Sequence, residues 1–409
     1  MAFFSSKDLP NVRPVADFNF AATKVLDNRI NFSRGSGGTY TDELGVVRYA
    51  PHNVPRFDHD PTTGESLGLL VEETRTNKFT RSSTIGGTGW TQQGTAADYT
   101  PNTTEVAAPD GTFTALKWQP SAIPQYLYQN LSNIGTTKST MSVWVRCPSG
   151  ETGAFSMNLY SPTQSQSGFT ATDQWQRFTW TFTPQSQANV YPIVPTTQSR
   201  VYYIWGPQLE EGAFATSYIS TSGATEQRKE DRVVVKGEKF KKIFDTSFNS
   251  FSALVDYNNI DTVANGASNG VFHLWGETTG YDDRITVSSD NNTANTAVRT
   301  RGIGGGSGVF ANSDALTASS QAATQKFAFS WSVPDYSNTS SRRWAFSFSG
   351  EDVDVVSDTT GTSVPQVTRL GLGINPTRLD EHGGKTHYKR VAIYNQVLTD
   401  EELKGLSAI

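Results

Sequence analysis

Adjacent carboxylates are the residues of this chain that could most directly do chemistry. Glycoside cleavage uses two carboxyl groups about 5 to 9 Å apart, one on each side of the sugar. Neighbouring residues on a strand point to opposite faces, so an adjacent pair does not provide this geometry by itself. We therefore predict no catalytic residue and a protein that is not an enzyme. The pairs considered are Glu72-Glu73, Glu210-Glu211, Asp282-Asp283 and Glu401-Glu402.

Metal-binding residues form no clear pattern in the sequence. None of the five histidines has the i, i+4 partner of a helical zinc site, and the single cysteine, Cys147, excludes both a disulfide within the chain and a cysteine zinc cluster. Calcium at a sheet rim, held by Asp and Asn oxygens, is an alternative, although such loops are also ordinary turns. We predict no metal and no cofactor, and keep calcium as an alternative at Asp282, Asp283, Asp290, Asn291 and Asn292.

Aromatic residues beside polar ones give the best sequence-based candidate for a ligand site. A ring can stack on a sugar face while polar groups orient the hydroxyls. The competing interpretation places Trp275 in a core and the acidic pair in a solvated turn. Among the nine tryptophans, most alternate with polar residues, whereas Trp144 is out of phase with its apolar neighbours. The candidate glycan-binding group is Trp275, Tyr281, Asp282, Asp283 and Arg284.

The composition limits the class of protein that positions these residues. The chain has 409 residues, 36% of them hydrophobic, enough for two or three packed domains. A net charge of -5 argues against binding nucleic acid through many phosphates. No apolar run approaches the roughly 20 residues of a membrane span. We expect no nucleic acid and no membrane insertion, and the lack of disulfides suits a reducing compartment.

Apolar residues alternate with polar ones along much of the chain, which indicates β-strands. Residues 178–183, Phe-Thr-Trp-Thr-Phe-Thr, place aromatic rings on one face and threonines on the other. Near the C-terminus, Thr399 and Glu402 have the spacing of a helix capping box, and Leu403 and Leu406 then face the core. The prediction is an all-β chain: an N-terminal hairpin segment, two β-sandwich (jelly-roll) domains and a short C-terminal helix.

A sequence block near the N-terminus carries a resemblance to a known class of proteins. Residues 53–77, Asn-Val-Pro-Arg-Phe-Asp-His-Asp-Pro-Thr-Thr-Gly-Glu-Ser-Leu-Gly-Leu-Leu-Val-Glu-Glu-Thr-Arg-Thr-Asn, contain the turn Asp60-Pro-Thr-Thr-Gly64. Residues 31–45 look like the first half of the same block, with glycines at positions 35, 37 and 38 where small residues are usual. The block resembles one found in virion structural proteins of tailed bacteriophages, of the tail fibre or appendage type.

Two further stretches resemble modules that accompany this block. Residues 77–225 resemble a jelly roll of the carbohydrate-binding-module kind, on the basis of Trp205-Gly-Pro-Gln-Leu-Glu-Glu-Gly212 and Thr216-Ser-Tyr-Ile219. Residues 251–409 resemble a concanavalin A-like, laminin-G-like sandwich, through Val391-Ala-Ile-Tyr394 and the helix after it. Residues 226–250 read as a charged connector. Residues 1–76 are then an N-terminal attachment segment, and we expect their removal to leave both sandwiches folded.

The resemblance implies a function. The chain is expected to be a non-enzymatic phage virion protein, a tail fibre or appendage that attaches to host-surface glycans and takes part in virion assembly. Its partners would be other virion proteins and copies of itself, with a trimer as the first expectation. A head fibre or capsid-decorating protein and a polysaccharide depolymerase are the alternatives. The expected location is the virion, assembled in the cytoplasm of the bacterial host, which the lack of disulfides suits.

Overall fold

The computed structural model describes most of the chain in stretches separated by gaps. Strands make up 49% and helices 7% of it, which confirms the all-β prediction with little helix. Within the described stretches, no helix has the length and apolarity needed to cross a bilayer. The described residues are 10–160, 163–184, 186–244, 250–259, 268–276, 284–292, 295–304, 307–310, 325–332, 343–356, 366–373 and 384–408.

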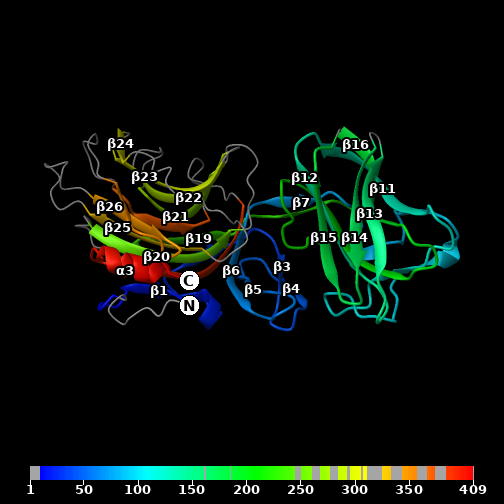
Figure 1. Cartoon of the computed structure of the whole chain (residues 1–409), viewed down its shortest axis with the longest axis horizontal. Helices are drawn as coiled ribbons and strands as arrows, with labels where there is room; N and C mark the ends of the chain where they lie inside the picture. Colours follow the sequence, from blue (N-terminus) through cyan, green and yellow to red (C-terminus); the bar gives the residue numbers. More distant parts are fainter. Residues whose placement is uncertain are drawn as a thin grey trace.

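The elements are arranged in two lobes joined near the middle of the molecule (Figure 1). One lobe contains a jelly roll built from the chain between β7 (Arg75–Asn77) and β18 (Glu226–Arg228). The other contains a larger sandwich to which strands from both ends of the chain contribute, and β1 (Ala16–Phe18) and α3 (Asp400–Ser407) both lie on it. The jelly roll is therefore an insertion into the larger sandwich.

The jelly-roll lobe consists of two five-stranded antiparallel sheets. Alternate residues of both sheets point inward, as a strand with one buried face requires, and the enclosed core includes Trp118, Met141, Phe155 and Ile193, each at most 1% exposed. One sheet has the order β15-β12-β17-β10-β9 (Gln176–Phe182, Ser139–Arg146, Tyr202–Glu211, Leu116–Trp118 and Tyr99–Thr100). The other has the order β14-β13-β16-β11-β8 (Gln164–Ala171, Gly153–Tyr160, Ser186–Pro195, Tyr126–Gly135 and Thr91–Gln93). Short 3-10 helices lie at Ser82–Thr84 and Ala96–Asp98.

The larger sandwich packs an eight-stranded sheet against a seven-stranded one around an aromatic core that includes Phe251, Phe329 and Trp344. The first has the order β27-β26-β25-β20-β29-β6-β5, with β1 also paired to β29 (Asp354–Val356, Arg343–Phe348, Gln325–Ser332, Ser250–Asn259, Lys385–Tyr394, Ser66–Glu72 and Phe57–His59). The second has the order β2-β19-β28-β21-β22-β23-β24 (Asn31–Ser33, Arg232–Lys236, Arg369–Leu372, Ser268–Trp275, Arg284–Asn292, Asn295–Gly304 and Ser307–Phe310). The short helices α1 (Phe20–Thr23) and α2 (Glu238–Lys241) flank these sheets.

Strands from the N-terminal segment belong to these two sheets. In the β6–β29 ladder Leu69 lies opposite Tyr388, and β1 pairs with the other half of β29. Likewise β2 pairs with β19, a strand of the stretch expected to be a connector. The boundaries predicted after residues 76 and 225 coincide with the β7–β18 pair, but residues 16–72 share sheets and core with residues 250–394. We therefore no longer expect the sandwich to fold without residues 1–76.

The C-terminal helix matches its prediction. The Thr399 side chain accepts from the Glu402 backbone, and the Glu402 carboxylate accepts from the Thr399 backbone, so the capping box is complete. Leu403 and Leu406 are buried against Ala328 and Ala345 of β25 and β26. The helix thereby covers the outer face of the eight-stranded sheet.

Isolated fragments should separate the two lobes. A fragment of residues 78–225 contains its whole core and should fold by itself, with a dispersed amide NMR spectrum. A fragment of residues 226–409 lacks β1 and β6, which pair with β29, and β2, which pairs with β19, and also the core residues Phe18, Leu69 and Val71. It should therefore show the narrow spectrum of an unfolded chain.

A matched control replaces residues 78–225 by a short Gly-Ser linker between β7 and β18. Because the ends of these strands are neighbours, this chain should keep the larger sandwich folded. A well-folded fragment of residues 226–409 would contradict the shared-sheet interpretation.

Candidate functional site

The predicted glycan-binding group is described only in part. Trp275 and Arg284 lie opposite each other at the β21–β22 edge, and each is 6% exposed. The Trp275 ring also packs against His273, with centroids 5.2 Å apart. This burial and the contact with His273 leave little of the Trp275 ring surface open to a sugar. Tyr281, Asp282 and Asp283 lie outside the described residues, so the group as a whole stays a prediction.

The candidate calcium ligands are likewise described only in part. The backbone of Asp290, Asn291 and Asn292 belongs to β22, and Asp282 and Asp283 fall outside the described residues. Among the residues that are described, no group of three or more His, Cys, Asp and Glu side chains could hold a metal ion.

Trp144 belongs to an aromatic cluster on the outer face of the sheet β15-β12-β17-β10-β9. Its ring meets Trp205 and Tyr218 edge-on, at 5.2 and 5.8 Å, and the Arg177 guanidinium lies 4.3 Å from its centroid. Val47 of β4 (Val47–Ala50) packs on the same cluster. Strand β4 pairs with β3 (Gly38–Thr41), so this hairpin covers the outer face here. Trp144 is thus occupied by packing rather than displayed as a platform.

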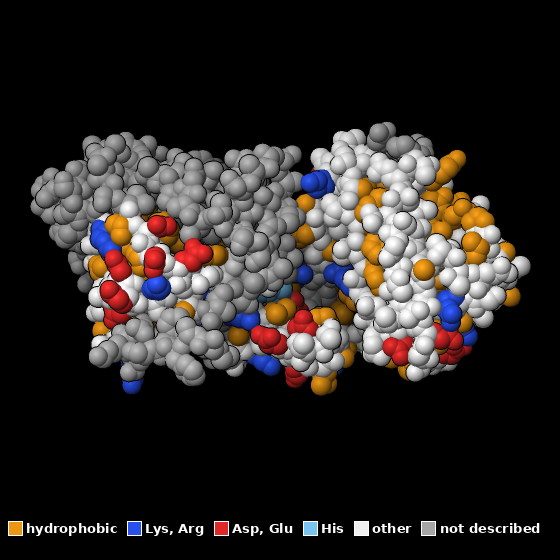
Figure 2. Space-filling model, viewed as in Figure 1, with side chains coloured by type: hydrophobic (Ala, Val, Ile, Leu, Met, Phe, Trp, Pro, Cys, Tyr) orange, Lys and Arg blue, Asp and Glu red, His pale blue; other side chains and the backbone are white. Residues whose placement is uncertain are grey.

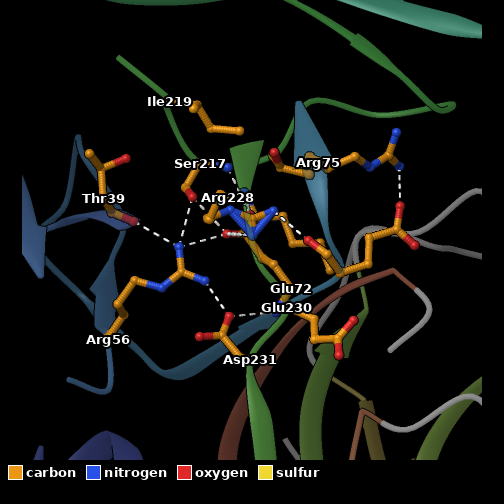
Figure 3. A network of polar contacts seen from close by, with 12 residues as sticks. Thr39, Arg56, Glu72, Arg75, Ser217, Ile219, Arg228, Glu230 and Asp231 are labelled. Carbon is orange, nitrogen blue, oxygen red and sulfur yellow. Dashed lines mark hydrogen bonds and ion pairs between the residues drawn. The ribbon is translucent and has the colours of Figure 1, made fainter. Parts of the chain in front are cut away.

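Charged side chains from residues 31–45 and 53–77, together with Arg228 and Asp231, form a buried ionic cluster between the lobes (Figure 3). Arg56 donates from Nη1 to Glu72 at 2.7 Å and from Nη2 to Asp231. Arg34 reaches the other oxygen of Asp231 at 2.9 Å, and Arg228 lies 3.3 Å from Glu72. All five residues, which we call the junction cluster, are at most 1% exposed. Arg34 directly follows β2, Arg56 directly precedes β5 and Glu72 ends β6. Arg228 ends β18, and Asp231 lies between β18 and β19.

Ser217 ties the junction cluster to the jelly roll. Its backbone N–H donates to one Glu72 oxygen at 2.8 Å and its hydroxyl to the other at 2.7 Å. Burial alone would raise the pKa of Glu72, but the charges of Arg228 and Arg56 hold that pKa well below its usual value. With no exposed surface, the Glu72 and Asp231 carboxylates cannot reach a substrate, and we assign the cluster a structural role.

A polar pocket lies beside the junction cluster, against the β7–β18 pair. Its volume is about 430 Å³. The Glu73 carboxylate is paired with Arg75, and Glu230 accepts from Thr74 at 3.3 Å and pairs with Arg232. The pocket's carboxylates are thus largely engaged by neighbouring side chains. The lining residues are Glu73, Thr74, Arg75, Thr76, Lys78, Glu211, Gln227 and Glu230.

Four tyrosines gather on the outer face of the other jelly-roll sheet, β14-β13-β16-β11-β8. The Tyr191 ring of β16 lies 4.9 Å from Tyr128 and 5.5 Å from Tyr126, both on β11. Their neighbours in sequence, Leu127 and Val190, are fully buried, which places the rings on the opposite, outer face. Tyr160 of β13 is 60% exposed. We call this surface the tyrosine face.

Amide side chains lie among these rings. Asn158 is the cross-strand partner of Tyr191, and Asn189 is the partner of both Tyr160 and Asn130. The Asn130 and Asn189 side chains hydrogen-bond at 2.7 Å. Among the described residues, Asn158 Oδ1 has no hydrogen-bond partner although it is buried. Rings for stacking and amides for hydroxyl groups therefore occur on one surface.

Burial raises the pKa of Tyr191, and the neighbouring tyrosines Tyr128, Tyr126 and Tyr160 raise it further against the opposing effect of Asn189. The Tyr191 hydroxyl therefore stays a neutral hydrogen-bonding group at physiological pH. Sequence reasoning missed this surface because it searched for tryptophans and acidic pairs. The phase of residues 126–131, Tyr-Leu-Tyr-Gln-Asn-Leu, was the available indication, since the leucines mark the inner face.

No protein-family model and no curated protein matches the chain. Among solved structures, it is similar to the CBM40 carbohydrate-binding module of Ruminococcus gnavus IT-sialidase bound to α2,3-sialyllactose (19% identity, 39% of this chain, 83% of that chain, TM-score 0.30). It is also similar to domain 4 of the arabinanase AbnA from Geobacillus stearothermophilus (13% identity, 48% and 82% covered, TM-score 0.30). A third is the CBM22 tandem domain of Paenibacillus barcinonensis Xyn10C (10% identity, 79% and 98% covered, TM-score 0.26).

Replacing Glu72 by Gln should strongly destabilise the protein. The substitution leaves Arg56 and Arg228 buried with one anionic partner fewer, and breaking a buried ion pair in this way costs about 3 to 5 kcal/mol. Urea unfolding followed by tryptophan fluorescence measures the loss. The matched control is Glu65→Gln, at an exposed pair with Lys389, where less than about 1 kcal/mol should be lost. Equal losses in the two variants would contradict the role of the junction cluster.

The free energy of unfolding should depend on pH differently in the wild type and in Glu72→Gln. Because the pKa of Glu72 is lowered on folding from its ordinary value of 4.5, the stabilisation is present above that value and is lost as the pH falls through the lowered pKa. The gap in unfolding free energy between wild type and Glu72→Gln should therefore narrow between about pH 7 and about pH 3. A gap that stays constant over this range would show that the Glu72 charge is not the source.

Proposed function

We propose that this chain is a non-enzymatic virion protein of a tailed bacteriophage, a tail fibre or tail appendage, whose jelly roll binds glycans of the host surface. The virion assignment is supported by the resemblance of residues 31–45 and 53–77 and of the jelly-roll motifs to phage structural proteins. Its partners would be other virion proteins and further copies of the chain, with a trimer as our first proposal. Symmetric copies would multiply a weak glycan contact.

The observation that carries glycan binding is the tyrosine face. Tyr128 is half-buried and Tyr160 is 60% exposed on the outer face of this sheet. Tyr191, itself 9% exposed, supports the Tyr128 ring from 4.9 Å, and Asn158 and Asn189 lie on the same face. Aromatic rings contribute apolar surface for the C–H face of a sugar, and amides offer both donors and acceptors to its hydroxyls. The opposite outer face of the jelly roll is covered by the β3–β4 hairpin. Binding is therefore assigned to the uncovered sheet.

The depolymerase alternative needs a pair of accessible carboxyl groups, which the described carboxylates near the junction cluster do not favour. A depolymerase needs two carboxyl groups that face a sugar. Glu72 and Glu210 are fully buried, while Glu73 and Glu230, which line the polar pocket beside the junction cluster, are paired with arginines. A head fibre or capsid-decorating protein is the alternative within the structural class, and location on the particle distinguishes it.

Labelling of intact virions tests the assignment to the particle. Gold-conjugated antibodies against the chain should decorate the tail or its appendages in electron micrographs. Labelling over the capsid would favour the head-fibre alternative. Absence of the chain from purified particles, measured by mass spectrometry, would overturn the virion proposal.

Variants of the tyrosine face test binding. Tyr128→Ala combined with Tyr160→Ala should reduce binding of the fluorescently labelled protein to host cells by about tenfold, the loss expected from removing stacked rings. The control is Tyr49→Ala, which removes a tyrosine of β4 that is 69% exposed and lies outside the tyrosine face. Unchanged binding by a folded double variant, or release of reducing ends from host polysaccharide by the wild type, would contradict the proposal.

A further inference from the structure

The sheet that carries the tyrosine face contains no charged residue. None of the residues of β8, β11, β13, β14 and β16 is Asp, Glu, Lys, Arg or His, although charged residues make up 18% of the chain. The opposite sheet of the same jelly roll carries Lys117, Arg146, Arg177, Glu210 and Glu211. Charge is therefore distributed unequally between the two sheets.

The surface view agrees with this distribution. On the side of the molecule that Figure 2 shows, the jelly-roll lobe is largely white and orange, and the acidic side chains visible on it lie along its lower edge. The exposed polar groups of the sheet are hydroxyls and amides. Such a surface makes hydrogen bonds and ring contacts, but has no fixed charge on its strands to pair with a carboxylate or sulfate.

The strand register aligns hydroxyl, tyrosine and amide side chains in a row across the whole sheet. Thr91 of β8 lies opposite Tyr128 of β11, and the Tyr128 ring contacts that of Tyr191 on β16. Tyr191 lies opposite Asn158 of β13, which lies opposite Ser165 of β14. With strands about 4.8 Å apart, five strands extend the row over roughly 19 Å. A row of this length is longer than a disaccharide.

We propose that the tyrosine face binds an uncharged polysaccharide whose extended chain lies across the strands along this row. The inference rests on the proposed glycan-binding function and adds the class of glycan. An anionic chain would lose the hydration of its carboxylates at this surface without gaining a cationic partner, whereas a neutral chain would lose only hydroxyl hydration, which amides and tyrosine hydroxyls replace. Rings near the middle of the row and small polar residues at its ends fit a chain that continues past both edges.

Affinity electrophoresis and calorimetry of the full chain against defined polysaccharides test the proposal. The neutral probes are a β-1,4-glucan, a β-1,4-xylan, a β-1,4-mannan and dextran, and the anionic probes are polygalacturonate, hyaluronate and polysialic acid. We expect at least one neutral chain to bind, with affinity unchanged between about 0.1 M and about 1 M salt, because screening does not act on uncharged partners. Oligosaccharides of that glycan should gain affinity with length beyond the disaccharide, until the row is filled.

Two double variants test whether polysaccharide binding takes place on the tyrosine face and along the row. Tyr128→Ala with Tyr160→Ala should weaken neutral-chain binding about tenfold, while Tyr49→Ala should leave it unchanged. Thr91→Lys with Ser165→Lys, at exposed positions at the two ends of the row, should add salt-sensitive binding of anionic chains.

The outcomes separate this inference from the function on which it rests. Preference of the wild type for anionic chains, or affinity that does not rise beyond the disaccharide, would overturn the neutral-chain inference and leave glycan binding in place. Binding of no probe, together with cell binding that does not depend on the tyrosines, would overturn both. A change of oligomeric state in the double tyrosine variant, without a change in glycan binding, would identify the face as a contact between copies of the chain.

Discussion

The junction cluster is the interaction on which the arrangement of the molecule depends. Three buried arginines and two buried carboxylates would be costly to remove from water separately. They are tolerated because each guanidinium finds a carboxylate or backbone carbonyls, as Arg34 does at Asp231, Ala50 and Pro51. The residues come from the N-terminal block and the chain after the jelly roll, with Ser217 added from the jelly roll itself. The cluster closes only when all of these segments are in place.

Single polar residues elsewhere hold the same junction together. Asn77 accepts from the backbone of Leu209 at 3.1 Å and donates to Ile219 at 2.8 Å. Glu210 is fully buried and accepts from both the backbone and the hydroxyl of Thr216. These residues belong to sequence motifs at residues 53–77, 205–212 and 216–219. The motifs therefore specify how the jelly roll is attached to the sandwich, and they leave its outer sheet unconstrained.

Local patterns predicted the elements well and their partners poorly. Alternation in residues 178–183 identified β15, and the Thr399–Glu402 spacing identified the cap of α3, because both signals depend on residues close together in the chain. The pairing of Leu69 with Tyr388 depends on residues more than three quarters of the chain apart, and no local pattern records it. For this reason residues 1–76 read as a separate segment, although their strands complete the sandwich.

The tyrosine face, to which we assign the proposed binding, was missed for a related reason. Trp275 and its polar neighbours are adjacent in sequence and look like a site, but the described part of that group is buried. The tyrosine face is assembled from β11, β13 and β16, each of which contributes one or two unremarkable polar or aromatic residues. The absence of charge over these strands was visible in the sequence. It becomes informative only when the sheet order shows that the strands are neighbours.

One outer face of the jelly roll attaches the lobe to the rest of the molecule, and the other outer face is left uncovered by the β3–β4 hairpin. The face with Trp144 and Trp205 is covered by the β3–β4 hairpin, and Thr39 of that hairpin also donates to the Tyr218 carbonyl at 2.7 Å. Both chain connections pass through the β7–β18 pair, and Ser217 bonds to Glu72. Several independent contacts thus fix the orientation of the jelly roll, where a single flexible linker would leave it free to turn. A surface held at a fixed orientation loses less rotational freedom when it binds. Under the proposed function, weak contacts repeated over symmetric copies would then act together on one polymer.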